Sequence, residues 1–392
     1  MLALLLMPVP ADSVIGSESK YAQDIQKLSN SDAKVRSEAV WSLGRSGDPS
    51  AVDKLIPVLN DSDKDVREWA VLALVKLGGP AVNTLISVLS SENDSVRWQA
   101  AAALGLINDS AAVEPLIRAL FSQGNETRYW AAISLGQIKD KQAREALIHV
   151  LGNGNQSVRE ASGWALQSIE GTTAVDSLIK VLKDSDSLRR MGAAEALAKT
   201  GDIRVVEALI QALKDENGGV RAAAAGALGQ INDSRVVKAL IQTLADDDSA
   251  VRSRVVNALA EIGRPASDAL ILALENDDIL IKQGAAEALG DIRETRAIEP
   301  LISAFQSKEL RQVAANALVK INRSSAVEPI IQILKDENET DDMRADAAWA
   351  LGEMGDPRAN EALLQALASG RDNNVTMNAA RALKKIRLSG VI

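Results

Sequence analysis

The chain has few side chains of the types that ordinarily carry out catalysis. Histidine occurs once, at His149, and cysteine does not occur among the 392 residues. A zinc site of the usual composition and a nucleophile–histidine pair both need partners that are missing here. We therefore predict no metal, no cofactor and no His- or Cys-based catalytic site. A site made of carboxylates alone stays open, although no particular pair of acids stands out.

Two acidic runs match a calcium-binding loop only in part. The run that begins at Asp61 has Asp at its first, third and fifth positions, but its sixth residue is Val66 and its twelfth is Leu72. An EF-hand loop has Gly and a bidentate Glu at those two positions. The run at residues 336–340 departs from the pattern in the same way. We interpret both runs as turns that cap helices.

Large aromatic side chains are rare and unevenly distributed. Aromatic residues make up 3% of the chain, and the six tryptophans lie mostly in its first half. Clustered exposed aromatics typically bind peptides, proteins or flat ligands, because such side chains contribute a large share of binding energy. The candidate binding residues are Trp41, Trp69, Trp98, Tyr129, Trp130 and Trp164. A structural alternative is that Trp69 and Trp130 only fill gaps between helices built from small side chains.

The elements that would position these residues repeat along the chain about every 31 residues. A Val-Arg pair or a close equivalent is followed seven residues after the Arg by Leu, and often then by Gly. A fixed period of this length is typical of stacked supersecondary units. The Arg position, which we call the marker, is occupied in turn by Arg36, Arg67, Arg97, Arg128, Arg159, Arg190, Arg221, Arg252, Lys282, Arg311, Arg344 and Thr376.

Each period has the pattern of two helices. Val113, Leu116 and Leu120 recur at helical spacing and form one apolar face, and residues 121–126 are a polar turn. A second helix follows, with Ala131 and Leu135 on its apolar stripe. The sequence therefore predicts an all-α chain built from antiparallel helix pairs.

Two polar positions of the repeat have a structural interpretation. Four residues before the marker lies a residue that is often Asp or Asn, such as Asp63 or Asn93, and it is well placed to cap the second helix. The marker Arg and an acid of a neighbouring unit could also form a ladder of hydrogen bonds. We therefore interpret the Arg series as part of the scaffold.

The aromatic candidates occupy three positions of the second helix. Trp98 and Tyr129 come one residue after the marker, and Trp41 and Trp164 come five after it. At about 100° per residue, both positions point away from the core stripe. Trp69 and Trp130 come two residues after the marker, on the flank that faces the neighbouring unit.

The repeat resembles the HEAT-like repeats of the phycobilisome-lyase class over about residues 21–388. The residues that carry the resemblance are Asp186…Arg190…Ala193-Ala194-Glu195-Ala196-Leu197, Asp215…Val220-Arg221-Ala222-Ala223-Ala224…Ala227-Leu228-Gly229 and Ala326-Val327-Glu328-Pro329-Ile330-Ile331. The resemblance implies a right-handed α-solenoid of about twelve antiparallel helix pairs, whose second helices line the concave surface. Such repeats serve as scaffolds, chromophore lyases and enzyme subunits.

The two ends differ from the repeats. Residues 1–20 are expected to form a leader, residues 21–388 a single solenoid and residues 389–392 a tail. Residues 1–11 are too short to span a bilayer and contain no basic residue. We interpret them as a disordered leader or as a truncated signal peptide. A cytoplasmic and an exported location both stay open, and no transmembrane segment is predicted.

The leading functional hypothesis is a non-enzymatic scaffold that binds a protein or peptide on the concave, aromatic-rich face of its N-terminal repeats. The alternative is a bilin-lyase-like or other planar-ligand-handling protein, in which stacking aromatics hold the ligand. Nucleic-acid binding has less support, because the net charge is −9 and no basic stripe is present. The oligomeric state is left open.

Overall fold

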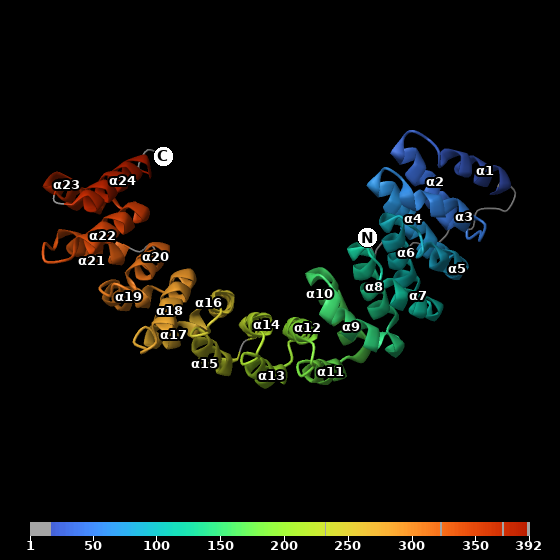
Figure 1. Cartoon of the computed structure of the whole chain (residues 1–392). Helices are drawn as coiled ribbons and strands as arrows, with labels where there is room; N and C mark the ends of the chain where they lie inside the picture. Colours follow the sequence, from blue (N-terminus) through green and yellow to red (C-terminus); the bar gives the residue numbers. More distant parts are fainter. Residues whose placement is uncertain (1–16, 232, 322–323, 371, 390–392) are drawn as a thin grey trace. The chain divides into compact units, whose positions relative to one another are not determined.

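The helix pairs predicted from the repeat form throughout the part of the chain that the structure describes. The computed structural model describes residues 17–231, 233–321, 324–370 and 372–389. Within these ranges the chain contains 24 α-helices, short 3₁₀ segments and no strand (Figure 1). The prediction of an all-α solenoid of about twelve helix pairs is confirmed.

The helices fall into two compact units, of which the first ends at Asp202. It begins with α1 at Ser17, so residues 17–20 of the predicted leader are helical, and residues 1–16 of that leader lie outside the described residues. Its pairs are α1 (Ser17–Lys27) with α2 (Ala33–Arg45), α3 (Ala51–Leu55) and its 3₁₀ continuation η2 (Ile56–Asn60) with α4 (Lys64–Leu77), α5 (Gly79–Val88) with α6 (Asp94–Ile107), α7 (Val113–Ala119) with α8 (Asn125–Ile138), α9 (Arg144–Asn153) with α10 (Gln156–Glu170), and α11 (Thr173–Val181) with α12 (Ser187–Ala198).

The second unit begins at Ile203. Its pairs are α13 (Val205–Ala212) with α14 (Gly218–Gly229), α15 (Ser234–Thr243) with α16 (Ser249–Ile262), α17 (Ser267–Ala273) with α18 (Ile279–Ile292), α19 (Ile298–Phe305) with α20 (Arg311–Ile321), α21 (Ser324–Lys335) with α22 (Asp341–Met354), and α23 (Asn360–Ser369) with α24 (Asn373–Ser389). No helix of the described ranges is long and apolar enough to cross a bilayer.

The residue four positions before the marker caps the second helix, as predicted. The carboxylate of Asp63 accepts hydrogen bonds from the backbone N–H groups of Asp65 and Val66, at 2.9 and 3.1 Å. These N–H groups have no partner inside the helix, so the cap satisfies them. The same role is played by Asp32, Asn93, Asn155, Asp186, Asn217, Asp248 and Asp278.

Some marker arginines link neighbouring repeats, and Arg36 does so through an acid other than the capping residue. Nη1 of Arg36 donates to the carbonyl oxygens of Asn30 and Ser31, while Nε and Nη2 both donate to the carboxylate of Asp61 at 2.7 Å. Asp61 lies six residues before the next marker, not four. The capping carboxylate is already occupied by its own helix, so the preceding turn residue is left to accept from the arginine.

These contacts also explain the acidic run at Asp61. Burial would raise the pKa of Asp61, but hydrogen bonds from Arg36 and from the N–H of Asp63 hold that pKa below its usual value. The second run is used in the same way, because Thr340 caps α22 and Asp336 accepts from Asn338. Both runs are therefore turn and capping structures, as predicted.

The recurrent Gly after Leu lets neighbouring second helices approach closely. A Cβ added at Gly44 on α2 would lie 2.5 Å from the Cβ of Ala73 and 2.6 Å from its Cα, on α4. Gly229 and Gly290 meet Ala258 and Ala317 in the same way. The close approach explains why Gly occurs eight residues after the marker. It also explains why a small residue occurs six residues after the marker of the next repeat. This contact fixes how tightly the second helices stack.

Candidate functional site

The second helices of the first unit carry the six aromatic candidates, and the structure brings five of them into two groups. Trp41 on α2 and Trp69 on α4 meet edge to face, with ring centroids 5.3 Å apart. Both rings are partly buried. The flank residue Trp69 thus packs against the preceding second helix, which is the contact expected of a gap-filling side chain.

The second group lies on the next two second helices, α6 and α8. The indole ring of Trp98 on α6 stacks on that of Trp130 on α8, with centroids 5.9 Å apart and an interplanar angle of 21°. Tyr129 meets Trp130 edge to face at 5.5 Å. The three rings are partly buried and form a continuous aromatic surface across α6 and α8.

Trp164 on α10 stands apart from both groups. It is 42% exposed, the highest value among the six candidates. Its ring lies against Gly136 of α8, where an added Cβ would be 2.5 Å from the ring. Among the described residues no ring contact joins Trp164 to the other candidates, or joins the two groups to each other. The six residues therefore do not form one cluster.

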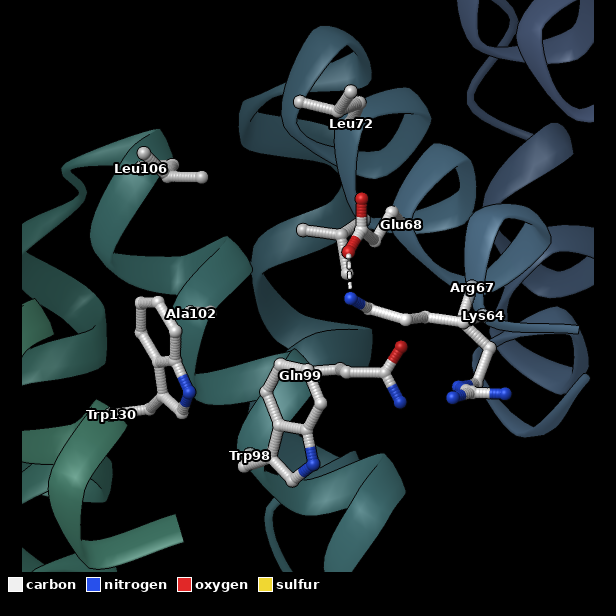
Figure 2. A pocket seen from close by; sticks show the side chains of 10 residues that line it. Lys64, Arg67, Glu68, Leu72, Trp98, Gln99, Ala102, Leu106 and Trp130 are labelled. Carbon is white, nitrogen blue, oxygen red and sulfur yellow. Dashed lines mark ion pairs between the residues drawn. The ribbon is translucent and has the colours of Figure 1, made fainter. Parts of the chain in front are cut away.

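A pocket opens beside the second group. It has a volume of about 300 Å³ and lies between α4 and α6, with Trp130 of α8 adding to its wall. The apolar lining consists of Val71, Leu72, Trp98, Ala102, Leu106 and Trp130. The polar lining consists of Lys64, Arg67, Glu68 and Gln99. Figure 2 shows Arg67 and Gln99 near one end of the pocket and Leu72 and Leu106 near the other.

Most of these lining residues were missed by the sequence analysis, which singled out large aromatics. The signal that would have found them is position, because Glu68, Leu72 and Ala102 stand one or five residues after their markers, like the aromatic candidates. Leu106 stands nine after its marker and is 45% exposed. One face of two neighbouring helices thus forms the pocket, and its small residue, Ala102, provides the space.

The polar end of the pocket is fixed by hydrogen bonds to the backbone. The Nε2 of Gln99 donates to the carbonyl oxygens of Leu59 and Ser95, at 2.8 and 2.7 Å. Nη1 of Arg67 donates to the carbonyl oxygens of Asp61 and Ser62, at 2.7 and 3.1 Å. These bonds hold the two side chains in place without a ligand.

The charges at the pocket are unequal. Lys64 and Glu68 form an ion pair one helical turn apart, at 3.5 Å, which Figure 2 marks with a dashed line. Arg67 has no ion pair with any described residue, so the three charged residues of the lining carry a net positive charge although the whole chain carries −9. A pocket that is apolar at one end and cationic at the other fits an amphipathic ligand.

The single histidine lies away from the pocket. His149 is exposed on the first helix α9. Its ring lies edge to face with Phe121 at 5.4 Å, and its Nδ1 is 3.0 Å from Nδ2 of Asn153. Over the ranges that the structure describes, no group of three or more His, Cys, Asp or Glu side chains is placed to hold a metal ion.

The comparison with family models identifies the repeat. The model for HEAT repeats matches residues 24–82, 82–167, 145–217, 175–253, 206–290, 237–309 and 302–384. These segments cover most of the chain, which therefore belongs to the HEAT-repeat family. A comparison with curated proteins gave no significant match.

Solved structures share the solenoid fold at low sequence identity. Kap121p bound to Pho4p is similar with a TM-score of 0.53 at 13% identity, over 94% of this chain and 49% of Kap121p. Kap121p determined separately gives 0.50 at 13% identity, over 94% and 49%. An engineered protein is 22% identical over 94% of this chain and 99% of its own, with a TM-score of 0.26. The chain thus spans about half the length of Kap121p.

Proposed function

We propose that the chain is a protein-binding scaffold that holds a peptide segment of its partner on the second helices of the first unit. The pocket between α4 and α6 is the anchor point, and the observation that carries the proposal is this pocket with its stacked wall of Trp98 and Trp130. Tryptophan is enriched among residues that dominate binding energy, mainly where it lines a pocket that a partner side chain fills.

The size of the pocket supports a peptide over a large planar ligand. Ligand sites commonly have volumes of about 300–1,000 Å³, and this one is at the lower limit. Such a volume suits one large side chain of a peptide better than a linear tetrapyrrole. Trp98 and Trp130 also stack on each other, so a planar ligand would reach only their outer faces. The peptide-binding hypothesis is therefore preferred to the lyase-like one.

The fold itself is compatible with this function. Kap121p, which shares it, has been determined with the protein Pho4p bound. The likeness concerns the fold alone, since identity is 13%. The proposal for this chain therefore rests on its own second-helix surface and on the uneven distribution of its tryptophans.

The test is a selection of random peptides displayed on phage against the full-length chain. We expect enriched peptides whose binding is lost in a Trp98→Ala/Trp130→Ala variant and retained in Trp349→Ala, which changes a second-helix tryptophan of the second unit. Circular dichroism would establish that each variant is folded. The exposed Leu106 gives a second variant, Leu106→Asp, that places a charge in the pocket without disturbing the core. Enriched peptides that bind all variants equally would contradict the proposal.

A further inference from the structure

The guanidinium of Arg67 differs from its counterparts in what its outer edge contacts. In Arg36 and Arg221, Nε and Nη2 both donate to one carboxylate of the next unit, Asp61 and Asp246 respectively, at 2.7 Å. In Arg67 only Nη1 makes hydrogen bonds. Among the described residues nothing accepts from its Nε or Nη2.

The sequence explains this difference. Asp61 and Asp246 each lie six residues before the next marker, and the residue at that position after Arg67 is Ser91, which has no carboxylate. The backbone contacts that orient the guanidinium are nonetheless the same as in Arg36. Arg67 therefore presents two parallel donors in a geometry that this chain elsewhere uses to bind a carboxylate.

The side chain of Arg67 lies at the polar end of the pocket. Arg67 is one of its lining residues, together with Trp98 and Leu106, and Figure 2 places the guanidinium at the polar end. Arg252 provides an internal comparison. Its Nη1 donates to the carbonyl oxygens of Asp246 and Asp247, and it too has no ion pair with a described residue, yet it does not line this pocket. Among the arginines that the structure describes, only Arg67 combines an unoccupied Nε and Nη2 with a place in the lining of this pocket.

We propose that the pocket recognises a partner segment in which a large apolar side chain is next to a carboxylate. The carboxylate accepts hydrogen bonds from Nε and Nη2 of Arg67, in the way that Asp61 accepts them from Arg36. The apolar side chain enters between Trp98 and Leu106. This inference rests on the proposed peptide-binding function and adds the charge of the partner, which is opposite to that of the pocket and the same as that of the chain as a whole.

The test compares two defined peptides, N-acetyl-Ala-Leu-Glu-Ala-amide and its Gln counterpart, on full-length protein labelled with 5-fluorotryptophan. Fluorine resonances of Trp98 and Trp130, assigned with Trp→Phe variants, report binding at the pocket. We expect saturable shifts of both resonances and a dissociation constant for the Glu peptide about five- to tenfold lower than for the Gln peptide. This comparison needs no substitution of Arg67 and therefore no change in folding.

Variants then assign the preference to one side chain. Arg67→Gln should remove the Glu preference, because it loses the charge and the two parallel donors, and Arg67→Lys should weaken the preference, because it keeps the charge but not the parallel donors. Arg252→Gln, which loses the same kind of backbone contacts, should keep it. Equal affinity for the two peptides, or a Glu preference that survives Arg67→Gln, would overturn the inference and leave the proposed function standing. If neither peptide shifts Trp98 or Trp130, the inference fails; if the displayed library also yields no pocket-dependent peptide, the proposed function fails with it.

Discussion

The contacts that a single residue makes in this chain depend on the neighbouring repeat. Every marker arginine has the same place in its own repeat, but Arg221 donates to a largely buried carboxylate of the next unit while Arg252 does not. The side chains of Arg221 and Asp246 are only 13% and 7% exposed. Removal of one partner of such a pair leaves a buried charge without compensation, which is costly.

The first prediction concerns this pair. Arg221→Ala should lower the free energy of unfolding of the second unit by about 3 kcal/mol. Arg252→Ala, which loses only hydrogen bonds to backbone carbonyls, should lower it by about 1 kcal/mol. Urea unfolding followed by circular dichroism would measure both. Equal losses of stability in the two variants would show that the ion pair between Arg221 and Asp246 does not link neighbouring repeats as described.

At the scale of helices, the repeat predicted the fold well because each of its positions has one dominant physical role. The capping Asp63, the apolar stripe and the marker could be assigned from spacing alone. The partner of Arg36 could not be assigned in this way, because two acids, Asp61 and Asp63, lie close together. Only the structure shows that Asp63 caps the helix and that Asp61 accepts from Arg36. The pocket could not be predicted either, since it depends on the contact of α4 with α6 and on the space left by Ala102.

The second prediction concerns the close approach of second helices. Gly44→Ala should destabilise the first unit by roughly 1–3 kcal/mol, because the new Cβ would overlap the backbone and side chain of Ala73. Gly79 is the matched control, since nothing lies within 4 Å of a Cβ added there. Gly79→Ala should change stability by less than about 0.5 kcal/mol. Thermal unfolding of the two variants tests this, and a loss of the same size in both would refute the packing argument.

At the scale of the whole molecule, acidic turns make stability depend on pH. The guanidinium of Arg296 lowers the pKa of Glu294 to about 2, and hydrogen bonds from Arg36 and Arg221 hold the pKa values of Asp61 and Asp246 below their usual range despite burial. Each carboxyl has a lower pKa in the folded state than in the unfolded state. Its contribution to stability is therefore present at neutral pH and is lost as the pH falls.

The third prediction follows from this loss of stability at low pH. The melting temperature should be constant near neutral pH and fall between about pH 4.5 and pH 2, the interval from the ordinary pKa of Glu294 to its lowered value. Burial raises the pKa of Asp346, so this one carboxyl favours folding at low pH. The several carboxyls with lowered pKa values outweigh it. Circular dichroism melts at a series of pH values provide the measurement. A melting temperature that rises on acidification would contradict the assigned ion pairs.

The proposed function requires that the pocket between α4 and α6 binds a partner segment. The most direct measurement is the dissociation constant of a selected peptide, by isothermal titration calorimetry, for the wild type and for the Trp98→Ala and Trp349→Ala variants. An anchor residue contributes about 2 kcal/mol or more, so we predict that Trp98→Ala weakens binding by more than about tenfold. Trp349→Ala should leave the affinity unchanged. Equal dissociation constants for the wild type and Trp98→Ala would contradict the proposed function.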